Sequence, residues 1–393
     1  MNKNIRLFLF LTILLIANLE SFLLLRHKSP FISDSFFYRH IVYQYLGNDY
    51  NQARNRVIET LPAKLDQISS NFFYNDSNYR KALKHFTKRP FYPWLVGITY
   101  RFTNQEYLSF LLPQLLALNI VLIASIYLFR QGLTVAGAII STALLAAFPP
   151  VIEWTTYFTG DIIGASFWLL QIALLFKLIQ KPKETNTKII FMAVLILSLL
   201  NREQSLLMNL VVPILYLSIK SQPTKRILAT VWKLTVLISI IYLSVLKLTE
   251  QYTILDTISY LRNNYGLSEN VYTFSQNIPF ILQSIVYAHQ SFLMDLIHHR
   301  WWLAITLTGI IGAVFAMKRP KIIDAVMLAS AIGSYAAIFI YPSFGYKYFF
   351  PIVISLIYFS IKLIRYNHSY RDVPPQRTLQ IPRTVVGPDR QRT

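Results

Sequence analysis

One carboxylate in an aromatic stretch is the first candidate for chemistry in this chain. Asp34 stands in the sequence SDSFFY, a few residues after the first long apolar run. A carboxylate set among aromatic side chains at an apolar surface costs desolvation energy, so its presence needs a reason. It has the chemistry of a general base toward a hydroxyl acceptor. The alternative interpretation is structural, with Ser33 or Asp34 as the N-cap of a helix over residues 36–45.

Two further carboxylates flank an aromatic segment at residues 154–160. Asp161 stands where an N-cap would begin the apolar run that follows, which is its structural interpretation. If the segment folds against the region of Asp34, either Asp161 or Glu153 joins that carboxylate around an acceptor or a divalent cation. We therefore predict no required cofactor and no dedicated metal site, and leave a divalent cation open.

Three cations occur where apolar runs end. Arg202 interrupts a long apolar stretch, Arg89 opens the sequence RPFYP, and Lys347 lies among aromatic residues before the last apolar run. Charges this close to a bilayer core are expensive and usually functional, and a phosphate group is the ligand they suit. The structural alternatives are an Arg202–Glu203 ion pair and, for the other two cations, side chains that reach the membrane interface.

Composition identifies the class of protein that must position these side chains. The chain has 393 residues, of which 54% are hydrophobic and 14% are charged. A soluble domain carries about 25% charged residues, so repeated apolar runs in this background indicate a polytopic membrane protein. The absence of cysteine excludes disulfides and a Cys nucleophile. We attribute the net charge of +20 to basic loops and contacts with membrane lipids, and not to nucleic acid.

The apolar runs predict an all-α transmembrane bundle of about ten spans. The predicted spans cover residues 5–25, 107–129, 133–150, 161–179, 189–200, 205–219, 227–248, 301–317, 322–341 and 349–364. They form one transmembrane domain over residues 1–364. We predict that residues 365–393, rich in proline and arginine, form a disordered tail.

The basic segments predict the orientation of this multi-pass protein in the cell membrane. The basic segments are the N-terminus, Arg130, 181–183, 220–226, 318–321 and the tail. If the chain has ten spans, all of these segments lie on the same side of the membrane. Positive charge marks the cytoplasmic side, so both termini are predicted to be cytoplasmic. Two larger loops, 26–105 and 249–300, then face outward. Apolar periodicity within the first loop predicts amphipathic juxtamembrane helices at 36–45 and 57–68.

The arrangement of these motifs resembles a known family. The four elements are an acidic residue followed by aromatics after span one (Asp34, Tyr38), the sequence RPFYP before span two (Arg89, Tyr92), the outward Asp161, and the sequence YKYFFP around Lys347. In this order they are similar to the GT-C superfamily of integral-membrane glycosyltransferases. The most similar branch is the one related to protein mannosyltransferases and lipid A aminoarabinose transferases.

The resemblance implies a hexosyl- or pentosyltransferase with a polyprenyl-phosphate sugar donor and an inverting displacement. It implies that Asp34 is the catalytic base, and we predict that Asp161 assists it. The predicted substrate-binding residues are Tyr38, Arg89, Tyr92, Glu153, Arg202 and Lys347. The acceptor is left open among protein, lipid and glycan. A secondary transporter and a lipid-linked oligosaccharide polymerase or ligase are the alternatives, although the chain lacks the paired halves typical of transporters.

Overall fold

The protein is an all-helical bundle with helical caps at one end. A computed structural model describes residues 3–62, 67–263, 270, 272–298, 300–340 and 346–371. Every regular element in these ranges is a helix, so the predicted fold class is confirmed. Its long helices are α1 (Lys3–Leu25), α7 (Glu106–Gly132), α10 (Asp161–Gln180), α13 (Gln222–Leu248), α15 (Phe274–His298), α16 (Arg300–Lys318) and α19 (Tyr346–Arg371).

Shorter helices complete the structure. Those of the first predicted loop are α2 (Ser33–Tyr45), α3 (Tyr50–Glu59), α4 (Gln67–Tyr74), α5 (Asp76–Thr87) and α6 (Phe91–Thr103). The others are α8 (Val135–Ala146), α9 (Pro149–Thr156), α11 (Thr185–Asn201), the 3₁₀ helix η1 (Glu203–Leu207), α12 (Met208–Ser218), α14 (Ile254–Arg262), α17 (Ile322–Tyr335) and α18 (Ala337–Ile340).

Each predicted span coincides with a helix or a pair of helices, but the number ten stays a prediction. Six helices of the described ranges are long and apolar enough to cross a bilayer, and a seventh is added if α8 and α9, bent by 53°, form one span. One of the six, α15, falls in the segment 249–300 that we interpreted as a loop. Its most apolar stretch has the lowest hydropathy of the six helices, which explains why we did not predict it as a span.

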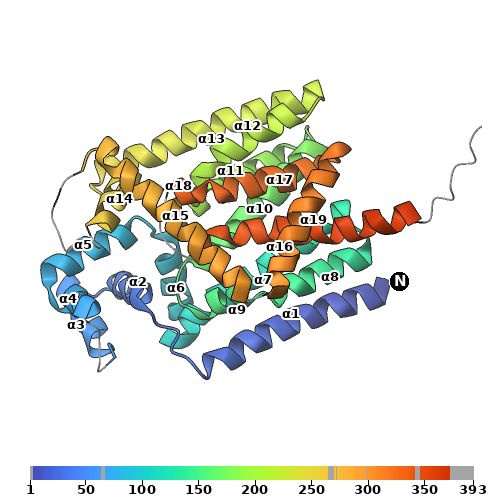
Figure 1. Cartoon of the computed structure of the whole chain (residues 1–393). Coiled ribbons are helices and arrows are strands. Elements are labelled where there is room, and N and C mark those ends of the chain that lie inside the picture. The colour runs from blue at the N-terminus through green and yellow to red at the C-terminus, as the bar shows by residue number, and fades with distance from the viewer. Residues whose placement is uncertain are drawn as a thin grey trace, which may run out of the picture.

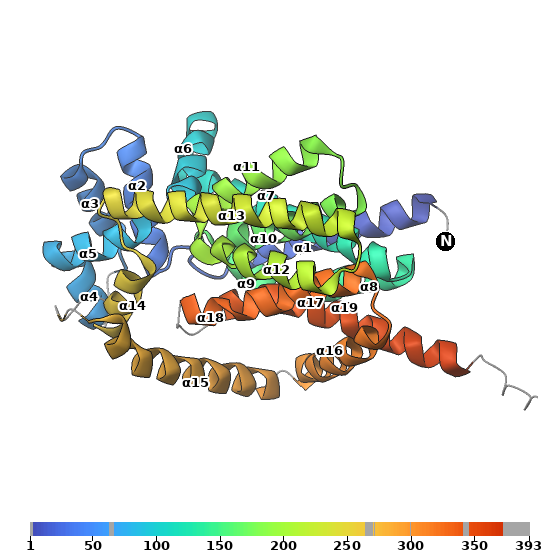
Figure 2. The same cartoon turned by 90° about the horizontal axis from the view of Figure 1, so that it is seen from above.

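The short basic segments and the two long predicted outward segments lie at opposite ends of the bundle. Figure 1 shows the N-terminus, the turn between α12 and α13 and the far end of α19 at one end. Helices α2 to α5 and α14 lie at the other end in both views (Figures 1 and 2). The two predicted outward segments therefore contribute helices to the same end. Helix α19 continues to Arg371, seven residues into the predicted tail, and residues 372–393 lie outside the described ranges.

Capping residues and prolines set the helix boundaries of the first loop. The Asp49 side chain accepts a hydrogen bond from the Gln52 N–H and starts α3, and Asn75 starts α5 in the same way. The predicted helix over 57–68 is wrong as one element, because α3 ends at Glu59 and Pro62 follows.

The two prolines of the sequence RPFYP lie at the start of a helix and do not prevent it. Helix α6 begins at Phe91 directly after Pro90. Pro93 stands in the first turn, where a helix leaves its N–H groups without intrahelical partners, so the missing donor does no harm.

Aromatic packing brings the start of the first loop against the turn before α10. The Phe31 ring packs edge-on against Phe158 at 5.1 Å and against Phe110 at 5.5 Å. The backbone N–H of Phe158 donates to the Pro30 carbonyl at 3.1 Å. The two segments that carry Asp34 and Asp161 are therefore held together, which is the condition on which the predicted pairing of carboxylates depended.

Candidate active site

Charged residues from four segments act on the buried hydroxyl of Tyr38. This residue is on α2 and is 2% exposed. Burial raises the pKa of its hydroxyl, while Arg89 and Arg202 act to lower it. Asp34 and Asp161 act to raise it further. Because such influence falls off with distance, the two carboxylates and two guanidinium groups are all near enough to act on this one hydroxyl.

Asp34 lies in the first turn of α2 and is half-buried. The helix begins at Ser33, with Ile32 in the N-cap position, so the interpretation of Ser33 or Asp34 as the N-cap is wrong. The Ile32 N–H instead donates to the Ser35 hydroxyl at 2.9 Å. A carboxylate in the first turn interacts favourably with the helix dipole.

Asp161 and Arg202 form a buried ion pair. Asp161 is the first residue of α10, and Arg202 is an extended residue between α11 and η1. Their side chains are 6% and 9% exposed, and Arg202 Nη2 contacts Asp161 Oδ1. The Thr159 hydroxyl donates to Asp161 Oδ2 at 2.7 Å. The predicted Arg202–Glu203 pair is wrong, because the partner of Arg202 comes from another helix.

Glu203 belongs to a second charged group, which sequence reasoning missed. Its Oε1 accepts a hydrogen bond from Lys88 Nζ at 2.7 Å, and its Oε2 lies 3.8 Å from Arg89 Nη2. Lys88 also donates to the Thr257 hydroxyl of α14 at 2.7 Å. Burial lowers the pKa of Lys88 to about 8, although the nearby Glu203 charge opposes the shift. Through Lys88 and Thr257 this group links the two predicted outward segments. Glu203 also orients the Arg89 guanidinium.

Tyr92 supports the Tyr38 ring from α6. The two rings meet edge-on at 5.3 Å. Gln114 Nε2 donates to the Tyr92 hydroxyl at 2.8 Å and to the Thr159 carbonyl at 2.6 Å. The Tyr92 ring is fully buried, and burial raises the pKa of its hydroxyl well above the ordinary value. Tyr92 therefore remains a neutral hydroxyl that fixes the Tyr38 ring and the loop before Asp161.

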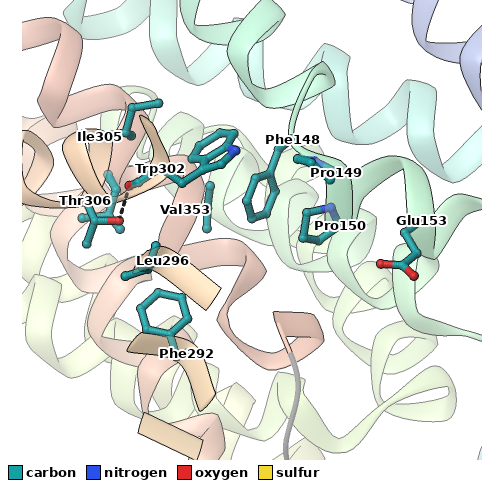
Figure 3. A pocket seen from close by; sticks show the side chains of 11 residues that line it. Phe148, Pro149, Pro150, Glu153, Phe292, Leu296, Trp302, Ile305, Thr306 and Val353 are labelled. Atoms are coloured by element: carbon teal, nitrogen blue, oxygen red, sulfur yellow. Dashed lines mark hydrogen bonds between the residues drawn. The ribbon is translucent and has the colours of Figure 1, made fainter. Parts of the chain in front are cut away.

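Glu153 has a different environment from Asp161. It is exposed on α9, and its Oε1 accepts a hydrogen bond from the Tyr157 hydroxyl at 3.1 Å. It lies at the edge of a cavity of about 110 Å³ between α9, α15, α16 and α19. Figure 3 shows Glu153 apart from the Phe148 and Trp302 rings, which also line the cavity. The mostly apolar lining suits an apolar chain and not a phosphate, so Asp161 is the carboxylate that accompanies Asp34.

The structure leaves two predictions untested, the role of Lys347 and the presence of a divalent cation. Lys347 falls in the first turn of α19, and its side chain lies outside the described residues. Within the described part of the chain, no group of three or more His, Asp or Glu side chains is arranged to hold a metal ion. Asp34 and Asp161 are the two carboxylates near Tyr38, and a divalent cation between them stays an open prediction.

The site can now be compared with known proteins. Residues 87–248 match the model of the family described as dolichyl-phosphate-mannose-protein mannosyltransferase. The predicted resemblance to the GT-C membrane glycosyltransferases is confirmed. The matched segment contains Arg89, Tyr92, Asp161 and Arg202, while Asp34 precedes it. With its apolar helices, the family match shows an integral membrane protein.

A solved structure provides a second comparison. The crystal structure of the Archaeoglobus fulgidus oligosaccharyltransferase, tethered to an acceptor peptide that contains the NVT sequon, is similar to this chain at 12% sequence identity. The match has a TM-score of 0.49 and covers 92% of this chain. The chain spans half the length of that oligosaccharyltransferase. No curated protein matches the sequence.

Proposed function

We propose that this GT-C-type protein transfers a sugar from a polyprenyl-phosphate donor to an acceptor nucleophile at the outer face of the membrane. The observation that carries the proposal is the buried Asp161–Arg202 ion pair, which together with Asp34 and Arg89 acts electrostatically on the buried Tyr38 hydroxyl. A site with both carboxylates and guanidinium groups suits a reaction that removes a proton from one partner and releases an anion from the other. The family match to lipid-phosphate sugar transferases supports the same donor class.

In the proposed reaction Asp34 is the general base. Its carboxylate takes the proton of the acceptor hydroxyl as the acceptor oxygen attacks the anomeric carbon of the sugar. The new carbon–oxygen bond forms on the face opposite the phosphate, the bond to the phosphate oxygen breaks, and the anomeric configuration inverts. The products are the glycosylated acceptor, polyprenyl phosphate and a protonated Asp34, which returns its proton to water.

Arg89 and Arg202 bind the phosphate in this proposal. A guanidinium group has five N–H donors in a planar fork, so it can contact both a carboxylate and a phosphate. Glu203 orients Arg89 and Asp161 orients Arg202 before the substrate arrives. Such preorganised donors stabilise the charge that develops on the leaving phosphate. We assign Lys347 to the same phosphate from its sequence motif, and Tyr38 and Tyr92 to the wall of the site.

The two ends of the bundle support the proposed orientation. The helices of both predicted outward segments cap one end, whereas basic segments lie at the other (Figures 1 and 2). Since positive charge marks the cytoplasmic side, the proposed site faces outward and both termini face the cytoplasm. A lipid-linked donor keeps its apolar chain in the bilayer and presents its phosphate and sugar at this end.

The proposal is tested with purified protein in liposomes that contain a radiolabelled polyprenyl-phosphate sugar. We expect consumption of the donor and release of polyprenyl phosphate when acceptor extracts of protein, lipid or glycan are added. Arg202→Met should abolish consumption, and Glu59→Gln, which changes an exposed carboxylate of α3, should not. If the wild-type protein consumes no donor but dissipates a solute gradient, the transporter alternative replaces the proposal.

A further inference from the structure

The first helix packs against the bundle through only one of its halves. The buried residues of α1 are Ala17, Ser21 and Leu25, all in its C-terminal half. The side chain of Asn18 forms hydrogen bonds with Asn119 of α7 there, at 3.0 and 3.2 Å. Only 11% of the most apolar 18-residue window of α1 is buried. The N-terminal half is therefore little covered by the bundle, and a space remains between it and α7.

This space is a cavity of about 950 Å³ between α1, α7 and the start of α8. In Figure 1 the N-terminus of α1 lies beside α8 at the end opposite the candidate active site. Its apolar lining residues are Leu7, Phe10, Ile123, Ile126, Val135 and Ile139. Leu7 and Ile123 are at least half exposed, although they face the cavity. The volume is at the upper end of the range of small-molecule sites, so the cavity accommodates a long ligand.

The charge around the cavity has one sign. Lys3, Arg6 and Arg130 line it together with the polar ends of Tyr127 and Gln131, and its lining contains no carboxylate. Val135, the first residue of α8, is part of the same wall, so the positive end of the α8 dipole lies at the cavity. Three cations and a helix N-terminus select an anionic group at this end. The adjoining aliphatic wall selects an apolar chain attached to that group.

We propose that this cavity binds an anionic membrane phospholipid. The lipid phosphate lies between Lys3, Arg6 and Arg130, and one acyl chain runs along Phe10 and Ile123 between α1 and α7. The basic part of the site suits an anionic headgroup, and the apolar part suits an acyl chain. A free phosphate has no acyl chain and a neutral lipid has no anionic headgroup, so neither matches both parts. Basic pockets between transmembrane helices on the cytoplasmic side are known to bind anionic headgroups, and the charge pattern predicts that this end is cytoplasmic.

The test measures lipid retention by the full chain. The protein is reconstituted in nanodiscs of phosphatidylcholine with increasing phosphatidylglycerol, released, and examined by native mass spectrometry. We expect one phosphatidylglycerol to be retained in preference to phosphatidylcholine. Arg6→Gln/Arg130→Gln should lower this preference about 25-fold, because each cation near an anionic lipid contributes about a fivefold change in affinity.

A matched variant controls for general charge. Lys220→Gln/Arg226→Gln removes two exposed cations at the same end of the bundle, around the α12–α13 turn and outside the cavity lining. It should retain lipid as the wild type does. The proposal is overturned if both double variants lose lipid equally, or if phosphatidylcholine is retained as strongly as phosphatidylglycerol. A second copy of the chain bound at this face, seen as a dimer mass that Val135→Trp removes without any change in lipid, would also overturn it.

Discussion

Substitutions in the buried Asp161–Arg202 ion pair can separate its contribution to stability from its contribution to sugar transfer. Asp161→Asn removes one charge of a pair whose side chains are 6% and 9% exposed. Breaking a pair this deeply buried costs about 3–5 kcal/mol, because the remaining guanidinium loses its counter-charge without gaining water. We therefore expect Asp161→Asn to lower the free energy of unfolding by about 3 kcal/mol.

The double variant Asp161→Asn/Arg202→Met removes both charges. It should recover most of the stability that the single variant loses, since an apolar replacement of a buried pair is often close to neutral. Sugar transfer should remain absent in the double variant, because it lacks Arg202, which holds the donor phosphate in the proposed reaction. Stability is measured by thermal unfolding in detergent, and transfer by release of polyprenyl phosphate. If the double variant regains transfer along with stability, the pair is structural and our assignment of Arg202 is refuted.

Three further predictions concern the same end of the molecule. Burial lowers the pKa of Lys88 to about 8, so transfer should fall as pH rises through about 8, where the pair with Glu203 loses its positive charge, and Lys88→Arg should extend activity to higher pH. The unfolded chain keeps the Lys88 proton up to about pH 10.5, so the free energy of unfolding should rise between about pH 8 and 10.5 because of this group. Unfolding scans that show a loss of stability specific to Lys88 in this window would contradict us. Burial also lowers the pKa of His40 to about 4 from 6.5, so its contribution of about 3 kcal/mol is complete above pH 6.5 and is lost as pH falls through about 4; hydrogen exchange of α2 and α5 should show this loss, and His40→Gln should remove the pH dependence. A Cβ at Gly164 would lie 3.0 Å from Arg202 Cδ, so Gly164→Val should displace that guanidinium and weaken donor binding more than tenfold in an equilibrium titration, with unchanged binding as the contrary result.

Sequence reasoning selected Asp34, Asp161, Arg89 and Arg202, but it missed Lys88 and Glu203 and did not predict how the charges pair. Apolar runs and basic loops predict the four selected residues at the same end of a helical bundle, and in the structure all four act electrostatically on the Tyr38 hydroxyl. The partner of each cation depends on how α5, α10 and η1 pack, which periodicity does not encode.

Local conformation explains the wrong pairing at residues 202 and 203. Arg202 has an extended backbone, with φ −158° and ψ 139°, and the 3₁₀ helix begins at the next residue. Successive side chains at such a junction point in different directions, so Arg202 reaches Asp161 while Glu203 reaches Lys88. A sequence in which two opposite charges are adjacent suggests a pair, but adjacent residues are poorly placed to form one.

The helices of the first loop show a similar limit. Capping residues such as Asp49 and Asn75 are visible in the sequence and do start helices. Proline alone is an ambiguous signal, because Pro62 follows the end of a helix at Glu59 whereas Pro90 precedes the start of one at Phe91. Whether a proline starts or stops a helix depends on which flanking segment is packed, and that is decided by tertiary contacts.

The central claim is that Asp34 is the general base of a sugar transfer. The most direct measurement is the single-turnover rate of Asp34→Asn in liposomes that contain a radiolabelled polyprenyl-phosphate sugar and a saturating acceptor. General-base catalysis contributes about 10²–10⁴-fold, so we predict a rate at least a hundredfold below wild type. Donor binding should be unchanged, since Arg89 and Arg202 are intact. A normally folded Asp34→Asn protein that transfers sugar within twofold of the wild-type rate would contradict the account.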